Sequence, residues 1–187
     1  MTVSAEQIPG YEAATWNIDP VHSEVSFTVR HMGISKVKGN FADFSGTIVT
    51  AANPVDSTVE ATVQVASVST NNKDRDQHLQ TSDFFAADEF PTFEFKSQNI
   101  EFQSPQEAKI TGELTMRGVT KEVTFDAELG AFGEDAYGQQ RLGLSAKTTV
   151  ERSDFGIEFN AAVEKTGNLV VSNKVVIELE LSAVKAA

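Results

Sequence analysis

The chain of 187 residues contains no cysteine. This absence excludes disulfide bonds, thiolate nucleophiles, and zinc or iron–sulfur sites with cysteine ligands. Basic residues are also few, because 15 lysines and arginines stand against 27 aspartates and glutamates, a formal net charge of −12. A surface this acidic repels nucleic acids and anionic membranes unless a local basic patch exists. The densest basic stretch holds only Arg30, Lys36 and Lys38, which is too few for nucleic-acid binding.

Long apolar runs are missing as well. No stretch approaches the roughly 18 apolar residues of a membrane-spanning helix, so we expect no stable membrane insertion. The first 16 residues lack the basic start and the apolar centre of a secretion signal, features by which such signals are recognised. We therefore expect a cytoplasmic protein.

Aromatic residues other than phenylalanine are scarce. The chain has 13 phenylalanines, but only one tryptophan and two tyrosines. A phenylalanine ring buries a large apolar area and has no polar atom that needs a partner. The composition leaves two interpretations open, a packed core rich in phenylalanine or a cavity lined for an apolar ligand.

Most of the chain alternates between apolar and polar residues, as Val59, Ala61 and Val63 do with their polar neighbours. A period of two is typical of a strand with one buried face. The pattern gives about eight long strands, and closure into a barrel removes both exposed edges of such a sheet. We therefore predict an all-β protein, an eight-stranded antiparallel barrel. The regular segments are 24–30, 58–66, 109–117, 122–129 and 175–181, and the less regular ones are 36–49, 92–103 and 141–150.

Residues 71–90 break the strand pattern clearly, because they are polar at first and then rich in phenylalanine. We predict a short helix over about 74–81 and a second turn capped by Asp83. We expect this segment to lie over one mouth of the barrel. The phenylalanines that it carries there are Phe84, Phe85 and Phe90.

Nothing in the chain marks a domain boundary, since no linker, low-complexity tract or internal repeat is present. We expect a single barrel domain over residues 16–187. A flexible tail is predicted over residues 1–15, and a mobile end after about Leu181.

Motifs for catalysis, nucleotide binding and metal binding are missing from the sequence. His22 and His31 are nine residues apart and would point to opposite faces of one unbroken strand. Asp19, His22 and Ser23 are the residue types of a catalytic triad, but a triad is defined by geometry in space. We favour a turn in which these side chains bond to the backbone. We expect no enzymatic activity, no metal and no cofactor.

An ordered series of short motifs resembles the YceI-like, polyisoprenoid-binding family over about residues 16–183. The series is more specific than any single motif. Its members are WNIDPVHSEVSFTVRHMG (16–33), VKGNF (37–41), FSG (44–46), DQHL (76–79), SDFF (82–85), FPTF (90–93), GELTMRGVT (112–120), RSDFGI (152–157) and NKV (173–175).

The resemblance implies a lipocalin-like antiparallel barrel that holds a long prenyl or similar amphiphilic chain in its lumen. It implies binding, storage or transport of a polyprenyl pyrophosphate, an isoprenoid quinone or a similar lipid. Many members carry a secretion signal, and this chain departs from them in that respect. An enzyme acting on an isoprenoid lipid remains an alternative, as does a stress-related structural protein with a packed barrel. A homodimer is left open.

The expected ligand-binding residues are those on the apolar strand faces and in the segment over the mouth. Arg30 and His31 follow the apolar run of the first strand, and His78 lies in the segment over the mouth. An arginine suits a phosphate because its planar fork donates two hydrogen bonds. The alternative is a buried Arg30 that pairs with a carboxylate and holds two strands together. The full set is Phe27, Val29, Arg30, Ala61, Val63, His78, Phe84, Phe85, Phe93, Phe95, Gly112, Leu114, Phe125, Leu142 and Leu144.

Overall fold

The fold is that of a computed structural model, which describes residues 2–161 and 170–187. The described residues form one short α-helix, α1 (Lys73–Leu79), and a single curved sheet. The same residues also form four 3₁₀ turns: η1 (Ala5–Gln7), η2 (Pro54–Asp56), η3 (Val65–Ser67) and η4 (Arg152–Phe155). No helix among the described residues is long and apolar enough to span a membrane. The strands are β1 (Ala14–Ile18), β2 (Glu24–His31), β3 (Ser35–Phe41), β4 (Phe44–Thr50), β5 (Thr58–Gln64), β6 (Val68–Ser69), β7 (Thr92–Ser104), β8 (Glu107–Met116), β9 (Val119–Glu134), β10 (Gln140–Glu151) and β11 (Lys174–Lys185).

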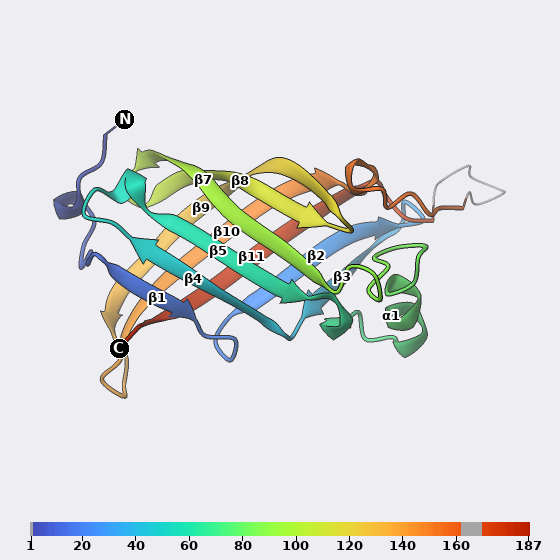
Figure 1. Ribbon diagram of the computed structural model, residues 1–187, viewed down its shortest axis with the longest axis horizontal. Coiled ribbons are helices and arrows are strands. Elements are labelled where there is room, and N and C mark those ends of the chain that lie inside the picture. The colour runs from blue at the N-terminus through green and yellow to red at the C-terminus, as the bar shows by residue number, and fades with distance from the viewer. Residues whose placement is uncertain (1, 162–169) are drawn as a thin grey trace.

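Eight strands close into a ring, which confirms the predicted antiparallel barrel (Figure 1). Their order is β1-β4-β5-β7-β8-β9-β10-β11, and β1 pairs with β11 to complete the circle. The remaining strands β2, β3 and β6 extend the ring at one end, where β2 pairs with the start of β11. Because β1 and β2, β3 and β4, and β5 and β6 are each the two halves of one bent strand, the chain winds around the barrel in sequence order.

The period of two explains most of this sheet, and the bends explain the rest. The less regular segment 36–49 is two strands that change direction between Phe41 and Phe44. The change of phase near Asn99 is a bulge, because the register between β7 and β8 shifts between Ser97 and Asn99. A bulge of this kind re-aims the side chains on one strand.

One end of the barrel is closed by the N-terminal segment, for which the sequence predicted a flexible tail. Val3 is fully buried and Ile8 is nearly so. Trp16 lies beneath them with its ring edge against Phe132, at a centroid distance of 5.6 Å. The C-terminal end is also part of the wall, because β11 runs to Lys185 and Ala183 is fully buried. The described residues of both ends therefore belong to the folded domain, and the mobile end predicted after Leu181 is wrong.

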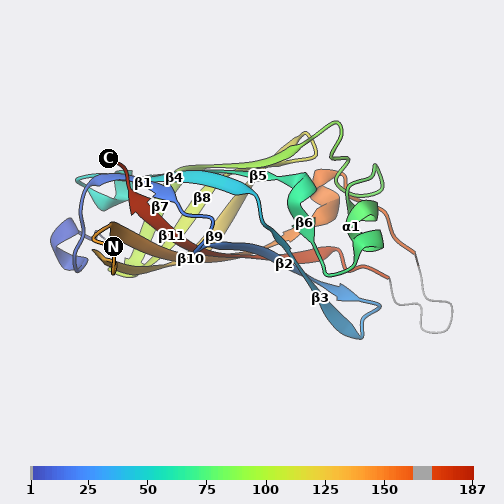
Figure 2. The ribbon, with the colours of Figure 1, turned by 90° about the horizontal axis from the view of Figure 1, so that it is seen from below.

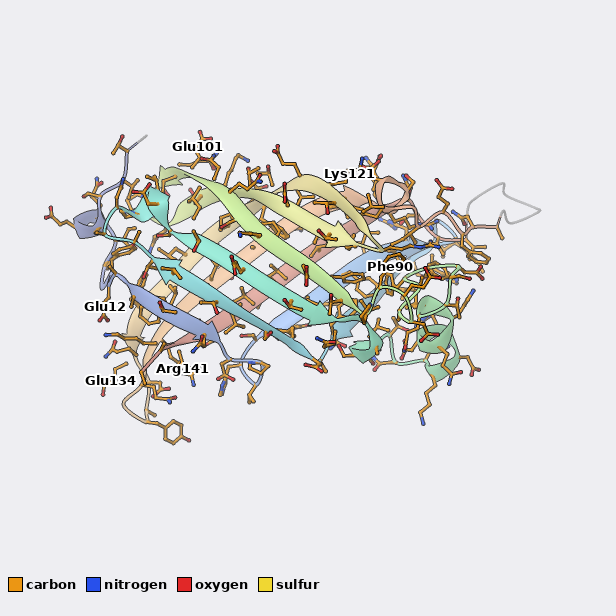
Figure 3. All side chains as sticks on the ribbon, viewed as in Figure 1. Glu12, Phe90, Glu101, Lys121, Glu134 and Arg141 are labelled. Atoms are coloured by element: carbon orange, nitrogen blue, oxygen red, sulfur yellow. The ribbon has the colours of Figure 1, made fainter. Side chains whose placement is uncertain are left out.

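A buried hydroxyl fixes the N-terminal segment to the closed end. The Thr50 Oγ1 accepts hydrogen bonds from the Trp16 indole N–H (2.8 Å) and the Ala14 backbone N–H (3.0 Å). The same hydroxyl donates to the Glu12 carbonyl at 2.6 Å. Figure 3 shows Glu12 at this closed end together with Arg141, whereas Phe90 lies beside α1 at the other end.

The corner between β1 and β2 is held by the Asp19 carboxylate. It accepts hydrogen bonds from the Val21 backbone N–H (3.0 Å) and Arg141 (3.0 Å) and lies 2.7 Å from the His22 Nδ1. Arg141 also reaches Asp135, in the turn between β9 and β10, at 2.6 Å. The predicted turn with side chains bonded to backbone is confirmed.

The same corner does not form a catalytic triad among the described residues. The Ser23 hydroxyl donates to the Ser182 carbonyl at 3.2 Å, and the Ser182 N–H donates back to it at 2.9 Å. Ser23 is therefore engaged with the backbone of β11 and is not poised against His22.

We expect acid to weaken this corner. The hydrogen bond with His22, followed by the bonds from Arg141 and Val21, lowers the pKa of Asp19 to about 2. Because the pKa is lowered on folding, the stabilisation is complete above the unfolded value of 3.8 and is lost as the pH falls toward 2. Unfolding in urea should show wild type more stable than Asp19→Asn at pH 6, with a difference that shrinks as the pH falls below 3.8.

The control for this prediction is Asp88→Asn, which changes an exposed aspartate in a loop. Its difference from wild type should stay small across the same pH range. A difference between wild type and Asp19→Asn that is constant from pH 6 to pH 2 would contradict a role for the charged carboxylate.

Candidate functional site: an apolar cavity with a polar mouth

The interior of the barrel holds a cavity of about 370 Å³. Ten of the eleven strands, all except β6, contribute lining residues. At one end the wall also includes α1 and residues of the loops, among them Phe84, Phe85, Arg152, Ile157 and Phe159. Within the barrel, the inward side chains are almost all apolar. The lining reaches α1 and the hairpin of β2 and β3, and this end is the mouth of the cavity. Figure 2 shows α1 and this hairpin at the same end of the barrel.

The structure brings most of the predicted site residues together around this cavity. All of them lie on its wall except Gly112 and Leu142. Whether they contact a ligand stays a prediction. The residues on the wall are Phe27, Val29, Arg30, Ala61, Val63, His78, Phe84, Phe85, Phe93, Phe95, Leu114, Phe125 and Leu144.

Gly112 does not leave space in the cavity, as the sequence pattern suggested. A Cβ atom there would lie 2.3 Å from the Lys96 carbonyl oxygen and 2.7 Å from the Phe95 ring. Glycine is required because β7 bulges against this point of β8 and the Phe95 ring covers it. Substitution of Gly112 would disturb the pairing of two strands, so it cannot test the cavity.

Leu142 lies beyond the cavity, at the closed end. It is 1% exposed and belongs to the same buried cluster as Trp16 and Ile8. Its strand position gave the correct face, because Leu144 and Ala146 on the same side of β10 do line the cavity. The depth along the barrel depends on the N-terminal segment, which fills this end.

Phenylalanine rings form the wall near the mouth. Phe41 packs against Phe27, Phe85 and Phe93 with ring centroids 5.6–6.2 Å apart. Such edge-on and tilted pairs are favourable beyond the area that they bury. The phenylalanine content therefore serves both interpretations of the sequence, since the rings are packed against each other and also face the cavity.

The predicted helix is present as α1, capped by the Asn72 side chain. His78 on α1 lies against the rings of Phe84 and Phe159, at 5.0 and 5.1 Å, and its Nε2 is 2.8 Å from an Asp83 oxygen. The residues around Asp83 form turns. This segment lies at the mouth, as predicted.

Arg30 lies at the rim of the mouth and not inside the barrel. Its side chain is exposed, so the alternative of a buried Arg30 paired with a carboxylate is wrong. The alternation of β2 explains the position, because Phe27, Val29 and His31 face the cavity, whereas Arg30 touches its edge and keeps an exposed side chain.

Arg152 is the mouth residue that the sequence analysis missed. It is 5% exposed and lines the cavity. Its three guanidinium nitrogens donate to the backbone carbonyls of Ser172 (3.0 Å), Ile157 (3.1 Å) and Val171 (3.3 Å). The alternation of β10 could have pointed to it, because Arg152 directly follows the strand, at the start of a 3₁₀ turn, and shares the parity of Leu144 and Ala146.

Burial is the cause of a lowered pKa for Arg152. Among the described residues no carboxylate lies within ion-pair distance of it. Carbonyl dipoles satisfy hydrogen bonds but bring no opposite charge, and a buried charge is costly unless it is paired. Arg75 on α1, whose Nε and Nη2 donate to Thr70, also lines the cavity. The mouth is therefore suited to an anionic or strongly accepting group.

No metal centre can be built from the described residues. They contain no group of three or more His, Asp or Glu side chains with the geometry to hold an ion. The arrangement as a whole can take an apolar chain in the barrel and a polar head at the mouth.

Comparisons with known proteins place this barrel among related chains. A family model described as a YceI-like domain matches residues 16–183. A UPF0312 protein of Pseudomonas putida is 36% identical over 163 residues, covering 86% of this chain and 85% of the relative.

Several solved structures are similar in fold, and two of them come from Campylobacter jejuni and Saccharophagus degradans. The YCEI protein of Campylobacter jejuni has a TM-score of 0.72 at 31% identity and covers 84% of this chain and 90% of that one. A structure described as a polyisoprenoid binding domain from Saccharophagus degradans has a TM-score of 0.69 at 14% identity, and the match covers 94% of this chain and 100% of that one. At 14% identity, the second likeness shows the fold alone.

Proposed function

Because the chain belongs to the YceI-like family, we propose that it binds a long-chain isoprenoid or similar amphiphilic lipid inside the barrel. The observation that carries this proposal is the apolar cavity of about 370 Å³ with one polar mouth. Small-molecule sites commonly enclose roughly 300–1,000 Å³ and are mostly apolar. The polyisoprenoid-binding description of the similar Saccharophagus degradans domain supports the same ligand class.

The size of the cavity argues against a barrel that is simply packed. In a protein core, empty space costs roughly 24 cal/mol per Å³, so a dry void of this size would cost several kcal/mol. A prenyl chain would recover about 0.8 kcal/mol for each buried methylene-sized group. The structural-protein alternative therefore has to explain an apolar cavity that is either an unfavourable void or filled with water, and a lipid carrier does not.

The chemistry of the mouth favours a ligand with a polar head. The apolar part of the wall offers no partner for charge, whereas Arg75 and Arg152 lie at the open end. A polyprenyl pyrophosphate would place its phosphates against these guanidinium groups, and a quinone would place its carbonyl oxygens there. We propose binding and transport in preference to catalysis, and turnover of a labelled prenyl diphosphate would test the enzyme alternative. The cytoplasmic location stays a prediction for cell fractionation.

Extraction with organic solvent tests the proposal directly. Protein purified without detergent should release an isoprenoid or similar lipid, identified by mass spectrometry, in an amount approaching one molecule per chain. Stripped protein should bind geranylgeraniol and its diphosphate. An extract without lipid, together with no uptake of either compound by folded, stripped protein, would contradict a carrier.

A further inference from the structure

An isoleucine projects from the rim of the cavity mouth. Ile34 is 78% exposed at the tip of the hairpin formed by β2 and β3. Met32 and Gly33 have φ angles of 55° and 68°, and the Ile34 N–H donates to the His31 carbonyl at 3.0 Å. This hydrogen bond closes the turn that carries Ile34. A single exposed apolar residue is common on protein surfaces, so this feature needs a second one beside it.

The second feature is a group of cations on the outer face of the same hairpin. Arg30 is paired with Lys36 in the register, and Thr28 with Lys38, so the three cations share one face. Lys38 is 3.5 Å from Glu24, whereas Arg30 and Lys36 take part in no ion pair with the described residues. On a chain with a net charge of −12, these residues form the local basic patch that the overall composition lacks.

The hairpin adjoins the opening of the cavity. Val29 and His31 face the cavity from β2, and the Met32 N–H donates to the Val170 carbonyl at 2.9 Å. Phe159, which is 38% exposed, lies at the same mouth against His78. Figure 2 shows the hairpin projecting past the body of the barrel at the end that carries α1.

We propose that this hairpin docks the mouth of the barrel on an anionic lipid surface. Ile34 enters the headgroup layer, and Arg30, Lys36 and Lys38 face the lipid phosphates. The partner follows from charge complementarity, because the chain as a whole is acidic and these cations give the hairpin a face that an anionic membrane attracts. This orientation presents the opening of the cavity to the bilayer. The inference goes beyond lipid binding, since it states where the barrel would load.

Basic residues near an anionic bilayer contribute attraction that falls off within a Debye length, so binding should weaken as salt rises. Contact by one isoleucine and a few cations is weak and reversible, as loading and release require. Figure 1 shows the turn between β9 and β10 at the opposite end of the molecule from α1. Tyr137 in that turn is 90% exposed and gives a matched apolar control.

The experiment is flotation with vesicles of equal parts phosphatidylglycerol and phosphatidylcholine, compared with vesicles of phosphatidylcholine alone. Wild type should float with the anionic vesicles, more at low salt than at high salt, and not with the neutral ones. Ile34→Ser and Lys36→Glu should each lower the bound fraction about fivefold or more. Tyr137→Ser and Lys109→Glu, a charge reversal on β8, should change it less than twofold.

Two results would overturn the docking face: no flotation of wild type with anionic vesicles, or equal losses for Ile34→Ser and Tyr137→Ser. A third result would also overturn it. If light scattering during gel filtration shows a dimer that Ile34→Ser converts to a monomer, the hairpin tip is a contact between two copies of the chain. Uptake of geranylgeraniol in solution is measured for every variant. Loss of flotation with normal uptake bears on docking alone, whereas loss of uptake in wild type bears on the proposed function.

Discussion

We expect Ala61→Trp to lower the amount of lipid that the barrel retains by at least tenfold relative to wild type, while the protein stays folded. Ala61 lies on β5 between Val59 and Val63, and all three line the cavity. The indole would occupy space that a ligand chain otherwise fills. Extraction and mass spectrometry measure the retained lipid, and unfolding in urea measures stability.

The stability result separates a cavity from a packed core. If the indole enters existing space, the free energy of unfolding should change by under about 1 kcal/mol, whereas overpacking of a filled core costs roughly 1–3 kcal/mol. Thr62→Trp is the matched control, because Thr62 is the next residue of the same strand and lies on the opposite face. Full retention of lipid by Ala61→Trp, or an equal loss in Thr62→Trp, would contradict a lumenal site.

Arg152→Gln is expected to change which lipid head the barrel prefers. Wild type should bind geranylgeranyl diphosphate more tightly than geranylgeraniol, because a phosphate supplies the negatively charged partner that the buried guanidinium of Arg152 lacks. The three carbonyl bonds do not use all the N–H donors of Arg152, so donors remain for a ligand. A hydrogen bond to a charged group is worth about 1.5–3 kcal/mol. The variant should lose about 10- to 100-fold in affinity for the diphosphate and less than threefold for the alcohol.

A purely structural role for Arg152 predicts a different result. The guanidinium joins the turn at Ile157 to Val171 and Ser172, so its loss could loosen the mouth and weaken both ligands equally. Arg152→Lys keeps the positive charge. If Arg152→Gln does not fold, the affinities of Arg152→Lys for the diphosphate and the alcohol are compared instead. Arg30→Gln is the control at the exposed rim, with a smaller expected effect on the diphosphate. Equal losses for both ligands, with a lower melting temperature, would overturn the head-group role.

The alternation of the strands carried most of the correct predictions about the site. Along a strand, successive side chains point to opposite faces whatever the rest of the protein does. For this reason Val63, Phe93 and Leu114 were correctly placed on the cavity side. The same parity leads to Arg152, the residue directly after β10. The exposed position of Arg30 also follows from the rule, although its charge suggested a place inside the mouth.

The local sequence pattern could not predict which residues of other strands each side chain contacts. Gly112 lies at an inward-facing position of β8, but a bulge on β7 and the Phe95 ring occupy the space beside it. Leu142 has the right face and the wrong depth, because the end of the barrel around it is filled by residues far away in the sequence. Such contacts depend on which bulges and bends bring two strands together.

The sequence by itself determined the class of the fold, the closure of eight strands into a barrel, the inward face of most of the strands that it recognised and the resemblance to a lipid-binding family. These follow from a backbone period of two and from short motifs, which are local. Only the tertiary structure decided that the N-terminal segment closes one end, with Val3 and Ile8 above Trp16. It also decided that Arg152 is buried without a carboxylate among the described residues and that Ile34 stands at the rim. Closure, depth and burial are set by contacts between distant segments, which no local pattern specifies.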